Sequence, residues 1–285
     1  MSDPDETESE SEGETEEVKT TVHILATVRK AELLPAAKLV FDSLRVGFPD
    51  ARVITWGNNL QGDIQSALQA RVESVGGEFR SLPPTVHDVW IEMLVRGSFQ
   101  PFWIVDTDVV FFGPTRTGQW PEGTILAGRY EPEFFEEWTG TRHMERLHTA
   151  VMWIDPSGLR NAAREWMARI PMPWRRTAEF PWVRQCFVPE KDLPALFYDT
   201  MAGVYHAFPG RCAAFSEPLD ECFEHLCCGS YVDLVAAGTE SGFGERLQAF
   251  HKRVFTNPDA AMGARFKQAE YYESRKGPTC NTRQE

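Results

Sequence analysis

Two aspartates, Asp106 and Asp108, interrupt an otherwise apolar stretch, and their spacing suggests chemistry. From Phe102 to Phe112 the chain reads Phe-Trp-Ile-Val-Asp-Thr-Asp-Val-Val-Phe-Phe. The apolar flanks predict a buried strand, in which residues two apart project to the same side and converge on one point. Two carboxylates that close repel each other, and a hard divalent cation such as Mg²⁺ or Mn²⁺ relieves the repulsion by binding oxygens of both. The spacing therefore predicts a metal site that could also take the oxygens of a diphosphate.

The charge of the chain is concentrated at its N-terminus. The 285 residues carry a net charge of −13, and residues 1–19 hold nine acidic residues and one lysine, so −8 lies in this segment and −5 in the rest. Such a run repels itself and has little to bury, so we expect a disordered acidic tail over 1–19. We expect a globular domain over 20–255 and a polar extension over 256–285. An acidic body without basic clusters argues against nucleic acid as a partner.

The sequence shows no sign of membrane insertion or export. It contains no run of about 18 apolar residues, and its acidic start is the opposite of the basic start of a signal peptide. Its six cysteines show no regular spacing that would indicate a disulfide framework. These observations predict a cytoplasmic protein without a membrane span.

Strands and helices alternate through the first half of the chain, as apolar spacing and turn residues indicate. The pattern predicts strands at 22–28, 52–56, 78–82 and 102–105, and helices at 32–46, 63–75 and 87–96. Such alternation is typical of an α/β fold with a mostly parallel central sheet and helices on both faces. Ligands of these sheets bind beyond the carboxyl ends of the strands, which is where Asp106 and Asp108 stand.

The second half is less regular. Strands are predicted at 124–130 and 147–154, followed by a helix that starts near Asp155, runs to about Ile170 and is capped by Ser157. The segment from Pro171 to Trp182 is rich in proline and tryptophan and predicts loops.

Three segments together resemble a glycosyltransferase of the GT-A type. Residues 21–27, Thr-Val-His-Ile-Leu-Ala-Thr, resemble its opening strand, and residues 104–110 resemble its Asp-x-Asp motif. Residues 148–157, His-Thr-Ala-Val-Met-Trp-Ile-Asp-Pro-Ser, resemble a segment of glycogenin-like and bacterial lipopolysaccharide-sugar transferases, although the usual Asn and Gly are replaced. The resemblance covers roughly residues 21–235 and implies a GT-A-like fold.

The resemblance implies metal-dependent transfer of a sugar from a nucleotide-diphosphate donor, with Mn²⁺ or Mg²⁺ as cofactor. The acceptor is left open among a glycan, a protein and a small molecule. In this family Asp106 would face the ribose and a metal-bound water, and Asp108 would bind the metal. A late histidine commonly completes the metal site, and here His225 is favoured over His206.

Further site residues follow from the same resemblance. Thr27 and Arg29 would lie near the base or phosphates, and His87 and Trp90 would border the donor sugar. An inverting enzyme also needs a carboxylate base near the acceptor. The sequence offers Asp155 and Glu179 for this role and does not choose between them.

Two other functions compete with this one. An apolar strand followed by Asp106-Thr-Asp108 also resembles the nucleophile motif of haloacid-dehalogenase-type phosphatases, in which Asp106 would attack phosphorus. That motif normally opens its domain, whereas here about 80 structured residues precede it. The other alternative is a protein of the same fold that binds sugar nucleotides without turning them over.

Overall fold

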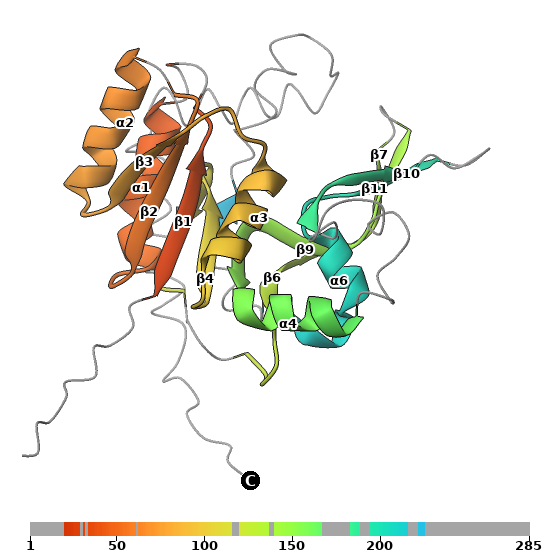
Figure 1. Cartoon of the computed structure of the whole chain (residues 1–285). Coiled ribbons are helices and arrows are strands. Elements are labelled where there is room, and N and C mark those ends of the chain that lie inside the picture. Colours follow the sequence, from red (N-terminus) through yellow and green to blue (C-terminus); the bar gives the residue numbers. More distant parts are fainter. Residues whose placement is uncertain are drawn as a thin grey trace, which may run out of the picture.

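A computed structural model describes residues 20–28, 31, 34–60, 62–115, 120–136, 140–166, 183–188, 194–215 and 222–225. Figure 1 shows a main sheet between helices, with a smaller sheet projecting to one side. The elements run in the order β1 Thr21–Ala26, α1 Leu34–Gly47, β2 Arg52–Asn58, α2 Gly62–Ser74, β3 Glu78–Leu82, α3 His87–Gly97, β4 Phe102–Asp106, β5 Val109–Phe111, β6 Leu126–Glu131, β7 Phe134–Glu136, β8 Thr141–His143, β9 Arg146–Ile154, α4 Pro156–Trp166, β10 Cys186–Val188, β11 Ala195–Tyr198, α6 Ala202–Ala207, the 3₁₀-helix η4 Pro209–Arg211, β12 Cys212–Ala214 and β13 Phe223–His225.

The main sheet has seven strands in the order β12-β6-β9-β4-β1-β2-β3. Strands β1 to β4 pair in parallel. Strand β9 is antiparallel to both of its neighbours, β4 and β6, and β12 is parallel to β6. Only one of the seven strands is therefore reversed. The central pair β1 and β4 comes from the regular first half of the chain, and β9 joins it to the second half.

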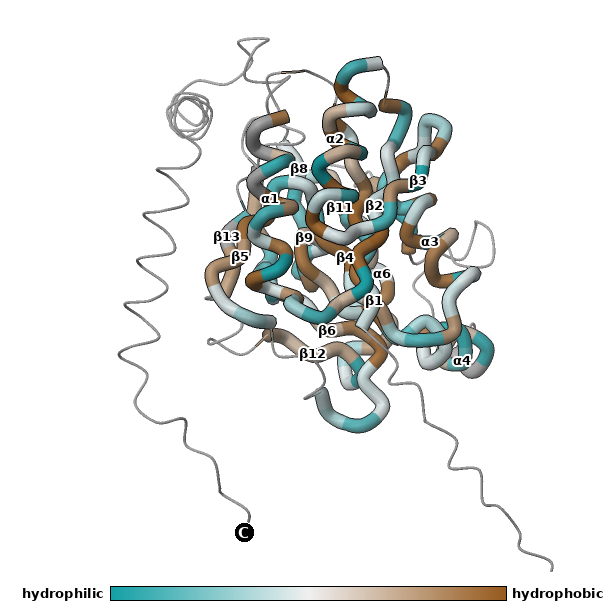
Figure 2. Tube along the Cα trace, turned by 90° about the vertical axis from the view of Figure 1, so that its left-hand side faces the viewer, coloured by the Kyte–Doolittle hydropathy of each residue, from teal (hydrophilic) through white to brown (hydrophobic). Residues whose placement is uncertain are grey.

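Both faces of the sheet are buried, and successive residues of a central strand serve different cores. On β1, Val22, Ile24 and Ala26 pack into one cluster, which also contains residues of α1 and α2. Leu25 of the same strand packs into the other, with residues of α3, α4 and α6. This alternation explains the continuous apolar run of the strand, because side chains on both faces leave water. The hydropathy trace shows the same arrangement, with apolar strands inside (Figure 2).

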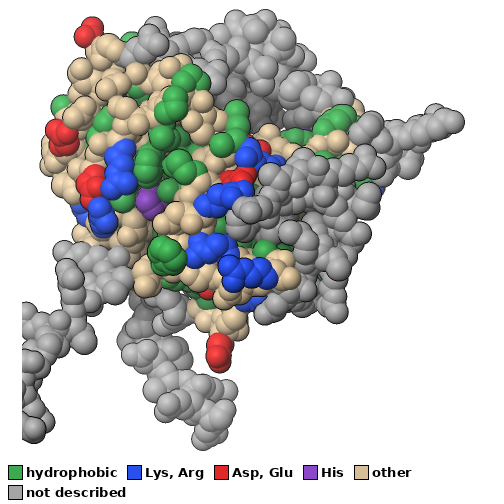
Figure 3. Space-filling view, viewed as in Figure 1, with side chains coloured by type: hydrophobic (Ala, Val, Ile, Leu, Met, Phe, Trp, Pro, Cys, Tyr) green, Lys and Arg blue, Asp and Glu red, His purple; other side chains and the backbone are tan. Residues whose placement is uncertain are grey.

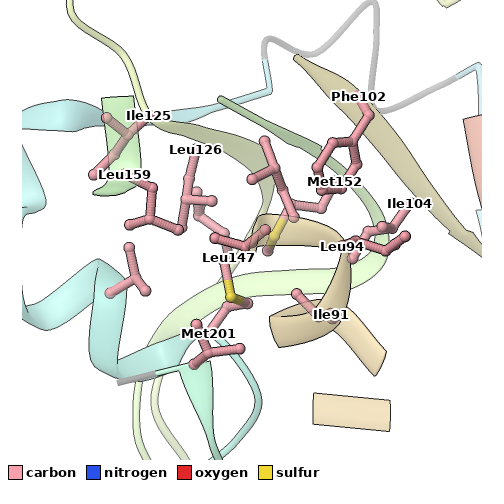
Figure 4. Close-up of a cluster of buried hydrophobic side chains, with 14 of the residues drawn as sticks. Ile91, Leu94, Phe102, Ile104, Ile125, Leu126, Leu147, Met152, Leu159 and Met201 are labelled. Atoms are coloured by element: carbon pink, nitrogen blue, oxygen red, sulfur yellow. The ribbon is translucent and has the colours of Figure 1, made fainter. Parts of the chain in front are cut away.

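The core under α3 shows how β4 is fixed. Ile91 and Leu94 of the helix lie against Phe102 and Ile104 of the strand, with Met152 of β9 beside them (Figure 4). Burying a side chain of this size stabilises the fold by about 1.5–3 kcal/mol. The strand that ends at Asp106 is thus anchored by packing over its whole length, which gives the acidic end a rigid support.

The second half of the chain contributes strands to two smaller sheets. One has four strands in the order β10-β11-β8-β7, and we call it the small sheet. The other is an antiparallel pair of β13 and β5, in which His225 lies opposite Val109. This pair brings the last described residues of the chain back to the segment that follows Asp108.

The predicted class, an α/β protein with a mostly parallel sheet and helices on both faces, is confirmed. Two local predictions are wrong. Asp106 and Asp108 do not share a strand, because β4 ends at Asp106 and a turn at Thr107 and Asp108 leads into β5. The helix after β9 is capped by Asp155 rather than Ser157, since Asp155 Oδ1 accepts the N–H groups of Ser157 and Gly158, both at 3.0 Å. Within the described ranges, no helix combines the length and apolar character that crossing a bilayer requires.

Candidate metal centre

The turn between β4 and β5 places the two aspartates at one end of the main sheet. β4 lies between β1 and β9 and is parallel to β1, so its carboxyl end meets the carboxyl end of β1. Thr107 and Asp108 are residue types that favour turns, and the turn they form separates β4 from β5. The side chain of Asp106 is 28% exposed and that of Asp108 is 10% exposed. The two carboxylates therefore lie at the carboxyl end of the central strands, Asp106 partly exposed and Asp108 nearly buried.

His225 joins this pair from the far end of the described chain. Its Nε2 lies 3.2 Å from Asp108 Oδ1, and one ligand atom from each of Asp106, Asp108 and His225 falls within 4.8 Å of the others. Carboxylate oxygens with one imidazole nitrogen form a donor set that suits Mn²⁺, and carboxylates alone also suit Mg²⁺. The residues present thus fit a divalent cation, and they come from β4, the following turn and β13.

The electrostatics of Asp106 match such a site. The pKa of Asp106 is raised to about 6, mainly by burial and also by the neighbouring Asp108, against the lowering effect of His87. His87 Nε2 lies 3.5 Å from Asp106 Oδ1, and the His87 ring stacks on fully buried Trp90 with centroids 5.7 Å apart. A carboxylate whose ionised form is disfavoured by burial and by a like charge is stabilised by an added cation. His87 therefore borders Asp106, while Trp90 supports His87 from the core.

The structure adds His148 of β9, which the sequence analysis did not select as a site residue. Its ring centroid lies 5.0 Å from that of His225. Its Nδ1 accepts the backbone N–H of Ala150 at 3.0 Å, so a neutral ring carries its proton on Nε2. The pKa of His148 is lowered to about 3, mainly by burial and also by the charges of His225 and Arg146. His148 is thus a neutral side chain beside His225 that can donate a hydrogen bond from Nε2.

Arg146, on the same strand as His148, is buried and forms ion pairs with two part-buried carboxylates. The Arg146 side chain is 7% exposed and pairs with Asp199 at 2.9 Å and with Glu131 at 2.7 Å. Asp199 also accepts the N–H of Thr200 at 2.7 Å and the amide of Gln185 at 2.9 Å. Burial acts to raise the pKa of Asp199, but Arg146 and these hydrogen bonds hold it below its usual range. The charge of Asp199 acts on both Asp106 and His148, so Asp199 belongs to the surroundings of the site.

The strand that carries His225 is held by an arginine on β6. The guanidinium carbon of Arg129 lies 4.4 Å from the ring centroid of Phe223, and Arg129 donates to the Phe223 carbonyl at 3.4 Å. The register of β6 against β9 shifts between Gly128 and Arg129, as at a β-bulge. Bulges re-aim side chains, and this one precedes the residue that contacts β13.

The remaining predicted residues are distributed as follows. Asp155 follows Ile154, which pairs with Phe102, so it stands at the opposite end of β4 from Asp106 and is not brought to the site. His206 Nε2 lies 2.9 Å from the Glu145 carbonyl, and His206 is not part of the Asp-Asp-His group. Thr27 follows β1 and is half-buried at the same sheet end. Arg29 and Glu179 lie outside the described residues.

Comparisons with known proteins give matches among solved structures only. No protein-family model matches the chain, and no curated protein does. The chain is similar to galactosyltransferase LgtC in complex with donor and acceptor sugar analogs, with 12% identity over 86% of this chain and 99% of that chain and a TM-score of 0.42. It is similar to the glycosyltransferase GlyE of Streptococcus pneumoniae TIGR4, with 8% identity over 93% and 66% and a TM-score of 0.46. Mouse xyloside xylosyltransferase 1 matches with 9% identity over 82% and 93% and a TM-score of 0.42.

These solved structures are glycosyltransferases, the class that the sequence resemblance implied. Identities of 8–12% and TM-scores below 0.5 do not establish what this chain does. Its function depends on the residues that its own fold brings together.

Proposed function

We propose that this chain is a metal-dependent glycosyltransferase that takes a sugar from a nucleotide-diphosphate donor. The observation that carries the proposal is the convergence of Asp106, Asp108 and His225 within 4.8 Å at the carboxyl end of a mostly parallel sheet. Nucleotide ligands of such sheets bind at this edge. The resemblance of residues 104–110 to the Asp-x-Asp motif points to the same chemistry.

In this proposal the chain's own residues bind and orient the donor. Asp106, Asp108 and His225 would hold the cation, which when bound supplies Lewis-acid stabilisation of the departing diphosphate. Trp90 packs behind His87, so that the imidazole keeps its place beside Asp106. His148 presents an N–H donor beside His225.

Other assignments stay proposals. We propose residues 20–255 as the transferase domain, and Thr27 and Arg29 as residues near the base or phosphates. With Asp155 at the far end of β4, Glu179 remains the sequence candidate for a base. Asp199 is a further carboxylate that acts electrostatically on Asp106.

The proposal is tested with a panel of nucleotide-sugars, each with and without Mn²⁺. Thermal shift measures binding, because a ligand at a hundredfold excess over Kd stabilises the folded state by about 2.7 kcal/mol. Release of nucleoside diphosphate measures turnover in the same samples. We expect at least one donor to raise the melting temperature only with Mn²⁺ and to be hydrolysed slowly. Binding without turnover would indicate a sugar-nucleotide-binding protein, and release of phosphate from phosphate esters without donor binding would indicate a phosphatase.

A further inference from the structure

The small sheet carries a row of aromatic side chains across all four of its strands. Phe134 of β7 pairs with His143 of β8, His143 pairs with Phe197 of β11, and Phe197 pairs with Phe187 of β10. Paired residues on neighbouring strands project to the same face of a sheet. The Phe134 and His143 rings stack at 4.4 Å, and the Phe197 ring meets His143 edge to face at 5.1 Å. We call these four residues the aromatic row.

The row is open to solvent at its two ends. Phe134 is 40% exposed and Phe187 is 57% exposed, whereas Phe197 and His143 between them are half-buried. Hydrophobic side chains are visible on this projecting part of the molecule (Figure 3). Single exposed apolar residues are common, but aromatic side chains in register on one face of one sheet are a group, and grouped exposed apolar side chains mark binding sites.

The length and chemistry of the row fit linked sugar rings. Strands lie about 4.8 Å apart, so a row across four strands is about 14 Å long, which matches a few linked pyranose rings. One face of a pyranose carries C–H groups, which pack on aromatic rings. The face of Phe134 that His143 does not cover and the exposed Phe187 side chain are open to such contacts. A polar group lies close to the row in sequence, since Glu145, two residues beyond His143, accepts the Tyr130 hydroxyl.

The row is also continuous with the candidate metal centre. Phe197 precedes Asp199 by two residues, and the charge of Asp199 acts on Asp106. On the β8 side, the chain runs from His143 through three residues to Arg146, the ion-pair partner of Asp199. Both β8 and β11 therefore lead within a few residues from the aromatic row to Arg146 and Asp199, which lie beside the candidate metal centre.

We propose that the aromatic row is a binding site for the pyranose rings of a linear carbohydrate, and that this carbohydrate is the acceptor of the transferred sugar. The role of the carbohydrate as acceptor rests on the proposed transferase function, whereas its binding to the row does not. A nucleic acid is a poorer occupant, because the chain has a net charge of −13 and the row lacks a basic cluster in its described part.

The experiment measures binding of defined linear hexasaccharides, namely maltohexaose, cellohexaose, xylohexaose and chitohexaose, to the full chain. Saturation-transfer NMR detects binding and titration gives Kd, without metal or nucleotide. The variant is Phe134→Ala with Phe187→Ala, which removes both exposed ends of the row. The matched control is Phe135→Ala, because Phe135 is 52% exposed on the same strand but projects to the opposite face. We expect the double variant to bind at least tenfold more weakly and the control to bind as wild type does.

Several results would overturn the proposal. These are no binding of wild type to any of the hexasaccharides, equal binding by the double variant, or an equal loss in Phe135→Ala. Sedimentation velocity tests whether a second copy of the protein occupies the row instead. A dimeric wild type and a monomeric double variant would assign the row to a dimer interface. If the double variant unfolds at a lower temperature, Phe187→Ser alone replaces it. Asp108→Asn separates the two proposals, because it should keep hexasaccharide binding and lose donor binding.

Discussion

The two halves of the molecule contribute to the candidate metal centre in different ways. The half from β1 to β5 is built mainly of alternating strands and helices and delivers Asp106 at the end of β4 and Asp108 in the turn that follows, so residues close in sequence are close in space. The half from β6 to β13 delivers His225, His148 and Asp199 from three separate strand ends. The first half supplies the charge that a cation neutralises, and the second supplies the groups that enclose it.

The two aspartates and His225 reach the site in different ways. Two carboxylates next to each other in sequence need only a strand and a turn. By contrast, His225 reaches Asp108 only because β13 pairs with β5 across more than a hundred residues. Closing such long loops costs entropy, which grows slowly with loop length, so packing must hold the distant strands in place. We therefore expect changes in the first half to abolish binding, and changes in the second to weaken binding or stability by graded amounts.

The largest effect is expected from Asp108→Asn. The variant keeps the shape of the side chain but removes its charge, so the cation and the Lewis-acid stabilisation of several kcal/mol are lost. Donor hydrolysis should fall about 10³-fold, which corresponds to about 4 kcal/mol. Turnover at saturating Mn²⁺ measures this loss, and Asp63→Asn, at an exposed position of α2, serves as the control. Unchanged Mn²⁺ dependence in Asp108→Asn would contradict the metal site itself.

The next effect concerns stability rather than binding. Arg146→Met removes the buried guanidinium that contacts the part-exposed carboxylates of Asp199 and Glu131, and losing such charged contacts costs about 2 kcal/mol. Urea unfolding measures the loss as a lower midpoint. Arg142→Met is the matched control, because its pair with Glu133 is exposed on both sides and is worth about 0–1 kcal/mol. Equal losses in the two variants would show that the Arg146 cluster does not anchor the second half.

The fold of the first half could be predicted from sequence because local signals agree there. The strand 78–82 has the predicted bounds, and the predicted helix 87–96 differs from α3 by one residue. The turn at Thr107 was missed because apolar flanks on both sides of the aspartates look like one continuous strand. In the second half, β7, β8 and β10 to β13 have three or four residues each, too few for a periodic signal.

The site was predictable to the same extent. Asp106 and Asp108 stand out because charge inside an apolar run is costly, and His225 stood out only through the resemblance. Nothing local distinguishes Asp199, whose position depends on pairing between β11 and β8. His148 does have a signal, a histidine within an apolar strand, but its relation to His225 appears only when β13 and β9 come together.

A smaller effect is expected from His225→Ala. With Asp106 and Asp108 still present, the cation loses one ligand of the set, and Mn²⁺ affinity should fall at least tenfold, or about 1.4 kcal/mol. The electron paramagnetic resonance signal of free Mn²⁺ measures the affinity directly. His206→Ala is the control, because His206 contacts the Glu145 carbonyl and not the aspartates. If His206→Ala weakened Mn²⁺ binding more than His225→Ala, the second half would supply a different ligand from the one that the structure places there.

The smallest effect is expected from Asp155→Ala, and it tests whether that residue is a base or a cap. Asp155 and Asp106 stand at opposite ends of β4. Five residue steps along the strand direction separate them, which corresponds to about 16 Å. A carboxylate so far from the cation cannot reach an acceptor hydroxyl next to the transferred sugar, since a base must lie within hydrogen-bond reach of the proton it takes.

Its structural role is local, because Oδ1 accepts two N–H groups in the first turn of α4. Loss of that cap should cost about 1 kcal/mol of unfolding free energy and leave turnover unchanged. Ser157→Ala is the control, because the Ser157 hydroxyl donates to the Phe99 carbonyl and accepts from the Arg160 side chain, and caps none of the backbone N–H groups in the first turn. Unfolding in urea and donor hydrolysis on the same samples separate the two roles. A folded Asp155→Ala protein with a hundredfold lower rate would restore Asp155 as a candidate base, and would mean that the two ends of β4 are not functionally separate.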